Sequence, residues 1–154
     1  MNSIAEELEI TGRVAYTNQG VSMRPLIRAG RDVWVIEKRS PEDIRKYDVV
    51  LFRRPPVNGR GVYVLHRVLK RFPDGRFWIV GDNCVSGETV RPEDVLGVMT
   101  QLKRAGKTVD FTSLWYRAYV MLWCAPWRLR FVLLRGIHFV QEAPGRIKRR
   151  VFRR

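Results

Sequence analysis

The sequence predicts a mostly β fold, with a compact antiparallel β domain over residues 1–110 and an amphipathic helical tail over residues 111–154. In the first part, short runs rich in Val, Ile and aromatic residues alternate with segments rich in Gly, Pro, Asp and Ser, a pattern typical of strands joined by turns. In the second part this pattern stops, and Trp, Tyr, Leu and Arg are intermixed. A chain of 154 residues with 45% apolar content is long enough to bury a core.

The elements of the β domain are expected in a simple order. The segment "SIAEELEI" favours a short helix, and "RVAYT" favours a strand. Further strands are expected at "DVWVIEK", "DVVLFRR", "GVYVLHRVLKRF", "RFWIVGD" and "VLGVMTQLKR". The segment "FPDGRF" is typical of a β-turn, because proline presets φ and Asp-Gly allows a tight bend. The strands on either side should therefore form a hairpin, with His66 on one strand and Asp82 at the end of the other.

The tail is expected to form two helices between residues 111 and 140. Asp110 and Thr112 are both suited to cap the first helix, and Pro126 is suited to the first turn of the second. The longest uncharged run, "AYVMLWCAPW", has ten residues, about half of what a membrane-spanning helix needs. We therefore expect that the tail does not cross a bilayer.

The charge distribution indicates an anionic partner. The formal net charge is +14, and residues 111–154 hold ten basic residues against one acidic residue. Trp115, Trp123 and Trp127 lie among these arginines, which is typical of helices in a membrane interface, so we predict that the three rings face an anionic membrane surface. In the alternative arrangement, the same rings pack on the β domain. The final segment "GRIKRRVFRR" should add a solvated basic end that is attracted to anionic lipid.

No targeting segment, metal site or cofactor is predicted. The N-terminus lacks the basic and apolar regions of a signal peptide, so we expect a cytoplasmic protein that is attached peripherally to the membrane. The two cysteines, Cys84 and Cys124, have neither the spacing of zinc ligands nor the number typical of a secreted disulfide framework.

Ser22, His66 and Asp82 are the candidates for chemistry. A hydroxyl group is a poor nucleophile until a base within hydrogen-bond reach takes its proton, and an imidazole base needs a partner that orients it. Each of the three residues alone is more often structural, but together they supply these three roles. The only other histidine, His138, lies in the aromatic tail.

Four blocks of the sequence add a family resemblance. They are "GVSMRPLIRAGRDVWVIEK", "KYDVVLFRR", "YVLHRVLKRFPDGRFWIVGDN" and "EDVLGVM". In order and spacing they resemble the catalytic domain of type I signal peptidases, which are related to LexA-type peptidases. The resemblance is greatest to the branch shared by archaea, endospore-formers and the endoplasmic reticulum, which has His where the usual bacterial enzymes have Lys. It implies a mostly β serine peptidase that cuts after small residues, in which Ser22 matches the nucleophile, His66 the base and Asp82 the acidic position of the GDN motif.

The chain also departs from the family pattern. The family's further catalytic aspartate falls near Glu88, so the third catalytic residue stays open between Asp82, which we prefer, and Glu88. Gly20 stands where the family often has a serine that helps to bind the oxyanion. Backbone N–H groups around the nucleophile should then supply most of the oxyanion hole, and Gly20, Val21 and Met23 are the predicted oxyanion and substrate-groove residues.

The predicted function is a serine endopeptidase that cleaves a leader or signal-like peptide from a precursor protein, at or near the membrane surface. The alternative is a catalytically silent signal-peptidase-like module that binds peptides or partner proteins at a membrane. Nucleic acid is disfavoured as a partner, because no helix-turn-helix module precedes Ser22 and the aromatic tail suits lipid better than a groove of DNA.

Overall fold

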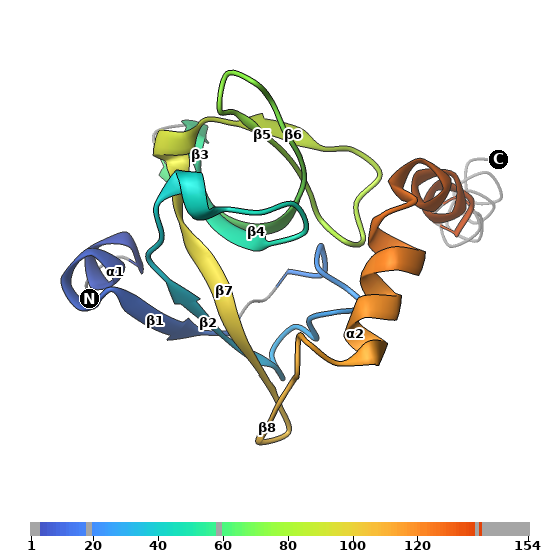
Figure 1. The fold of residues 1–154 in the computed structure, drawn as a ribbon, viewed down its shortest axis with the longest axis horizontal. Helices are drawn as coiled ribbons and strands as arrows, with labels where there is room; N and C mark the ends of the chain where they lie inside the picture. Colours follow the sequence, from blue (N-terminus) through green and yellow to red (C-terminus); the bar gives the residue numbers. More distant parts are fainter. Residues whose placement is uncertain (1–3, 18–19, 58–59, 138, 140–154) are drawn as a thin grey trace, which may run out of the picture.

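A single curled antiparallel sheet forms the body of the protein (Figure 1). The computed structural model describes residues 4–17, 20–57, 60–137 and 139. In chain order the elements are α1 (Ile4–Thr11), β1 (Arg13–Tyr16), β2 (Val33–Glu37), a 3₁₀ turn (Pro41–Asp43), β3 (Val49–Val57), β4 (Arg60–Arg71), β5 (Phe77–Val80), β6 (Glu88–Val90), a 3₁₀ turn (Pro92–Asp94), β7 (Val95–Arg104), β8 (Lys107–Thr108), α2 (Leu114–Tyr119) and a π-helical turn (Val120–Cys124). This architecture confirms the predicted mostly β fold with a helical segment near the C-terminus.

The curl of the sheet brings together strands that are not neighbours in it. The strand order is β1-β2-β7-β3-β4-β5-β6, and β8 pairs with β7. Arg54 of β3 nevertheless forms a two-pronged ion pair with Glu88 of β6, although β4 and β5 lie between these strands in the sheet. The four strands therefore surround a common interior, as the ring of β3 to β6 in Figure 1 shows.

The first four residues of β3, residues 49–52, are buried on both faces of the strand and divide the core into two clusters. Val49 and Leu51 pack in the cluster that also contains α1, while Val50 and Phe52 pack in the cluster beneath β5 and β6. Successive side chains of a strand point to opposite faces, so a strand with two covered faces needs apolar residues at every position. This requirement explains the uninterrupted apolar run "VVLF".

The predicted hairpin is confirmed. β4 and β5 pair in antiparallel register, with Arg71 opposite Phe77. The backbone N–H of Phe72 donates to the carbonyl of Arg76 at 2.8 Å, and Gly75 has φ of 84°, a left-handed conformation that favours glycine. The hairpin places His66 in the middle of β4 and delivers Gly81 directly after β5.

Two strands lie in segments that the sequence pattern assigned to connections. β6 has three residues and pairs with β5, and β8 has two residues and pairs with β7. Strands this short hold too few residues to show a period of two, and they form because a neighbouring strand offers unpaired backbone groups. β6 bears on function because Glu88 is its first residue.

The tail begins with a cap that differs from the two predicted ones. Ser113 caps α2, and its Oγ accepts a hydrogen bond from the backbone N–H of Tyr116 at 3.2 Å. Asp110 instead accepts hydrogen bonds from the backbone N–H and the hydroxyl of Thr112 at 2.7 and 2.6 Å. Because Asp, Thr and Ser have similar capping tendencies, their closeness in the sequence left the cap undetermined.

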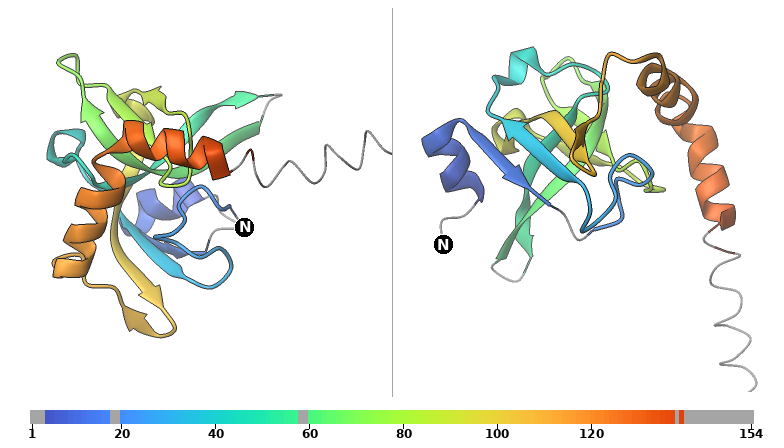
Figure 2. Two further views of the ribbon diagram at one scale, coloured as in Figure 1. Left: turned by 90° about the vertical axis from the view of Figure 1, so that its right-hand side faces the viewer. Right: turned by 90° about the horizontal axis from the view of Figure 1, so that it is seen from below.

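Two helical segments around Pro126 follow, as predicted. α2 continues into the π-helical turn, where the N–H of Ala125 donates to the carbonyl of Val120 at 2.8 Å. Residues 127–137 and 139 are helical, and both segments lie on the same side of the β domain (Figure 2). None of the helices in the described ranges is long and apolar enough to cross a membrane. His138 and the basic segment "GRIKRRVFRR" lie outside the described residues.

Candidate active site

Ser22 lies in a tight turn between β1 and β2. The backbone N–H of Arg24 donates to the carbonyl of Val21 at 3.1 Å, and the N–H of Ile27 donates to the carbonyl of Met23 at 2.9 Å. The side chain of Met23 is fully buried in the core, and this burial holds the turn against the β domain. Ser22 itself is half-buried.

Ser22 and His66 meet at Gly81. A Cβ atom on Gly81 would lie 2.7 Å from the carbonyl oxygen of Ser22 and 2.9 Å from Nε2 of His66, distances that a real Cβ does not tolerate. The turn of Ser22 is also tied to the loop after β5, because Asn83 donates its N–H to the Ser22 carbonyl at 2.7 Å and its Nδ2 to the Val21 carbonyl at 3.3 Å. The structure thus brings the backbone turn of Ser22 and the ring of His66 to the same glycine.

His66 has a buried ring with a carboxylate behind it. It lies on β4 opposite Val50 of β3 and is only 7% exposed. Its Nδ1 atom is 3.6 Å from Oε1 of Glu88. Burial lowers the pKa of His66 below its ordinary 6.5 and the positive charge of Arg54 adds to this decrease, whereas Glu88 opposes it. The imidazole is therefore neutral near pH 7, the state in which it accepts a proton.

Arg54 holds the carboxylate of Glu88 in place. Its Nε donates to Oε2 at 2.9 Å and its Nη2 donates to Oε1 at 2.6 Å. The same Oε1 atom faces His66, so a single carboxylate is shared between a guanidinium and an imidazole. Arg54 is a residue that the sequence analysis missed, because nothing distinguishes it locally from the other arginines of the strands.

Asp82, the preferred third residue, has other partners. Its carboxylate is fully buried and accepts hydrogen bonds from Nε and Nη2 of Arg67 at 2.8 and 2.7 Å and from the hydroxyl of Tyr119 at 2.7 Å. The cause is the alternation of side chains along β4. His66 faces the cavity described next, so its neighbour Arg67 faces the tail and takes Asp82. The structure places Glu88, not Asp82, against His66.

Ser22 and His66 both line a cavity of about 540 Å³. We call it the groove, and its lining residues are Ile4, Tyr16, Thr17, Gly20, Ser22, Trp34, Leu51, Arg54, Tyr63, Val64, Leu65, His66 and Cys84. Gly20 thus lines the groove, whereas Val21 beside it, which is 49% exposed, is not among the lining residues. The side chain of Met23 points into the core, so Met23 does not line the groove, while its backbone directly follows Ser22.

Cys84 is a second candidate nucleophile that the sequence analysis did not consider. It lines the groove, and the Cβ position on Gly81 that lies 2.9 Å from His66 Nε2 lies 2.6 Å from the sulfur of Cys84. Burial raises the pKa of the Cys84 thiol, which disfavours the reactive thiolate. A test of Ser22 as the nucleophile must therefore also include a variant that lacks the Cys84 thiol.

The three tail tryptophans do not share one environment. Trp115 is 87% exposed. Trp123 is half-buried and donates its Nε1–H to the backbone carbonyl of Asp82 at 3.0 Å, and half-buried Trp127 packs edge-on against Trp78 at a ring distance of 4.5 Å. The prediction that all three face a membrane is therefore wrong for Trp123 and Trp127, which pack on the β domain because they find partners there.

Other apolar side chains of the tail are exposed instead. We call this set the outer face, and its members are Leu114, Trp115, Met121, Leu122, Leu129, Val132, Leu133, Ile137 and Phe139. Large exposed apolar side chains in such number are unusual on the surface of a monomer and mark a surface that contacts something else.

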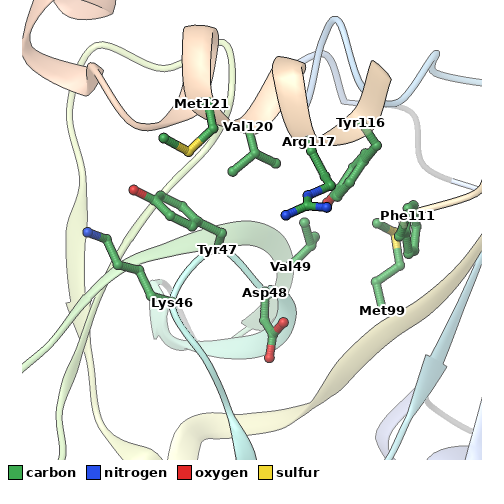
Figure 3. Close-up of a pocket in the computed structure, with 10 residues that line it drawn as sticks. All are labelled: Lys46, Tyr47, Asp48, Val49, Met99, Phe111, Tyr116, Arg117, Val120 and Met121. Atoms are coloured by element: carbon green, nitrogen blue, oxygen red, sulfur yellow. The ribbon is translucent and has the colours of Figure 1, made fainter. Parts of the chain in front are cut away.

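A second cavity, of about 400 Å³, separates α2 from the segment before β3 (Figure 3). It contains none of the predicted catalytic residues. Tyr116 and Arg117 reach into it from α2, and Lys46 and Tyr47 line it from the other side. Met121 of the outer face also lines it. Lys46 and Arg117 therefore lie at a cavity that borders the apolar outer face.

The described residues contain no group of three or more His, Cys, Asp or Glu that could hold a metal ion. Comparison with protein-family models, with curated proteins and with solved structures finds no match to this chain.

Proposed function

We propose that this chain is a serine endopeptidase, with Ser22 as the nucleophile, His66 as the general base and Glu88 as the carboxylate that orients the imidazole. The observation that supports it most is the position of His66, with Nε2 at the turn of Ser22 and Nδ1 toward Glu88. The resemblance to type I signal peptidases assigns the first two roles to the same residues.

In this proposal, His66 Nε2 takes the proton of the Ser22 hydroxyl as Oγ attacks the carbonyl carbon of the substrate peptide bond. Backbone N–H groups around Ser22 stabilise the oxyanion of the tetrahedral intermediate. The imidazolium then gives its proton to the leaving amine, and a water molecule attacks the acyl-enzyme with His66 again as the base. Glu88 stabilises the imidazolium in both halves of the reaction.

The groove supports a peptide as the substrate. Its volume of about 540 Å³ and its aromatic and aliphatic walls suit several side chains of an extended peptide. We propose a leader or signal-like peptide at the membrane surface, because the outer face is apolar and the tail carries an excess of basic residues. Lys46 and Arg117 beside Met121 would attract the headgroups of anionic lipids.

A fluorescent fluorophosphonate probe tests the proposal, because it reacts with activated serine hydroxyls. The wild-type protein should be labelled, Ser22→Ala should not be labelled, and His66→Gln should be labelled at least about a hundredfold more slowly. Cys84→Ser should keep its labelling, which separates the hydroxyl from the neighbouring thiol.

Two results would contradict the proposal. Labelling that persists in Ser22→Ala would reject the nucleophile. A wild-type protein that binds extended peptides in the groove but is neither labelled nor able to cut them would support the alternative, a catalytically silent module.

A further inference from the structure

Asp82 connects the tail to the loop that follows β5. On the tail side, the hydroxyl of Tyr119 donates to its carboxylate at 2.7 Å, and the indole N–H of Trp123 donates to its backbone carbonyl at 3.0 Å. On the sheet side, Arg67 binds both carboxylate oxygens. Asp82 and Arg67 are completely buried, so these contacts are shielded from water.

The same loop holds the proposed nucleophile. Asn83, the residue after Asp82, donates its backbone N–H to the carbonyl of Ser22 at 2.7 Å. Gly81, the residue before it, lies so close to His66 and the Ser22 carbonyl that a Cβ atom there would clash with both. A displacement of Asp82 would therefore shift Ser22 relative to His66, and a misplacement of about 1 Å in a reacting group costs about a hundredfold in rate.

Arg130 of the tail lies near Asp82 without forming a hydrogen bond to it. Arg130, in the second helical segment, is 1% exposed, and none of its three guanidinium nitrogens has a hydrogen-bond partner among the described residues. Its Nη1 lies 3.7 Å from Oδ1 of Asp82. An approach of about 1 Å would turn this contact into a charge-assisted hydrogen bond.

We infer that the tail is a positioning element of the active site and that contact of its outer face with an anionic membrane raises activity. The inference rests on the proposed function. Tyr119 and Trp123 hold Asp82, Asp82 fixes the loop, and the loop fixes Ser22. Lipid that binds the outer face of the same helices stabilises the docked tail, and Arg130 then completes its bond to Asp82. The membrane is the occupant favoured here because the outer face is apolar while the tail is strongly basic.

Two matched tryptophan variants of the full chain test the positioning role. Trp123→Phe removes the hydrogen bond to Asp82 and keeps an aromatic ring, and Trp127→Phe makes the same change where the indole only packs against Trp78. The readouts are the rate of fluorophosphonate labelling, kcat and KM for a peptide selected from a quenched fluorescent library, and the melting temperature. Trp123→Phe should lower kcat and the labelling rate about threefold to tenfold with little change in KM, and Trp127→Phe should lower neither.

The membrane part is tested with vesicles that contain phosphatidylglycerol and with vesicles of phosphatidylcholine alone. Anionic vesicles should raise the labelling rate of the wild type about tenfold, and in Arg130→Gln the ratio of rates with and without vesicles should fall to about one. A labelling rate that does not respond to vesicles, or that responds equally in Arg130→Gln, would reject this part.

The outcomes also separate the inference from the proposed function. If Ser22→Ala keeps the wild-type labelling, the proposed function fails. If Ser22→Ala is inert while Trp123→Phe behaves like Trp127→Phe at equal melting temperature, the enzyme stands and the positioning role of the tail is rejected.

Discussion

The Nδ1 atom of His66 lies 3.6 Å from Oε1 of Glu88, and this oxygen also accepts a hydrogen bond from Arg54 at 2.6 Å. The carboxylate is thus fixed on one side by a guanidinium and faces the imidazole on the other. Arg54 orients Glu88 but also lowers the pKa of His66 through its charge. Substitutions of His66, Glu88 and Arg54 should therefore have different effects on the pH dependence and on the rate of catalysis.

The pH profile of kcat/KM should have an acidic limb whose midpoint lies below 6.5. The reason is that burial lowers the pKa of His66, so the base stays deprotonated at a lower pH than a free imidazole. Arg54→Gln removes a positive charge that disfavours the imidazolium, so the midpoint should move up. Glu88→Gln removes a negative charge that favours the imidazolium, so it should move down. Arg53→Gln, on the exposed side of the same strand, is the control and should leave the midpoint in place.

Alanine variants should distinguish the two candidate carboxylates. Glu88→Ala should lower kcat about a hundredfold and change the melting temperature little, because Glu88 is partly exposed while its oxygen faces His66. Asp82→Ala leaves the charge of Arg67 buried without its partner, which should lower the free energy of unfolding by about 3–5 kcal/mol. Urea denaturation and peptide turnover measure the two effects. If Glu88→Ala keeps the wild-type turnover, the assignment of Glu88 is wrong.

Gly81→Ala should inactivate the enzyme more than it unfolds it. The new methyl group would meet the sulfur of Cys84 at 2.6 Å, the carbonyl of Ser22 at 2.7 Å and Nε2 of His66 at 2.9 Å, so the nucleophile and the base must separate. A loss of about a hundredfold in fluorophosphonate labelling is expected. Gly136→Ala is the matched control, because its Cβ would meet nothing within 4 Å. Equal labelling of both variants would contradict the proposed meeting of Ser22 and His66 at Gly81.

The outer face should bind anionic vesicles in a salt-dependent manner. Trp115→Ser and Leu122→Ser each remove a largely exposed apolar side chain, and each should weaken sedimentation with phosphatidylglycerol vesicles about fivefold. Binding should weaken as salt rises, because the headgroup attraction is screened. Trp127→Phe changes a ring that packs on Trp78 and should bind normally. Vesicle binding that is unaffected by either serine variant would show that another surface contacts the lipid.

Arg130→Met should leave the stability unchanged or raise it. The guanidinium of Arg130 is buried without hydrogen bonds among the described residues, and an apolar side chain of similar length avoids the cost of burying that charge. Asp82 keeps both hydrogen bonds from Arg67 in this variant. The midpoint of urea denaturation measures the change. A clear decrease would mean that the 3.7 Å contact between Arg130 and Asp82 already stabilises the folded protein.

Local patterns in the sequence were sufficient for the strands with regular alternation, for the hairpin and for the division of the tail at Pro126. These features depend on residues that are close in the chain, such as the Pro-Asp-Gly turn between β4 and β5. Strand β6 was missed because three residues carry no period, and its existence depends on the edge of β5. The cap at Ser113 was missed because neighbouring Asp and Thr residues have the same tendency.

For the candidate site, too, some features follow from the local sequence and others depend on the tertiary structure. The sequence by itself determined that His66 and Arg67 are adjacent on a strand, so their side chains must face opposite sides. It also indicated Ser22 and the GDN loop as candidate catalytic residues. Only the tertiary structure decided that Asp82 pairs with Arg67 and that Glu88 lies next to His66. The tail supplies Tyr119 and Trp123 to hold Asp82 on the side of Arg67. The curl of the sheet brings Glu88 of β6 back to Arg54 of β3 and to His66. Such contacts join residues that are remote in the chain, so no local pattern of side chains can specify them.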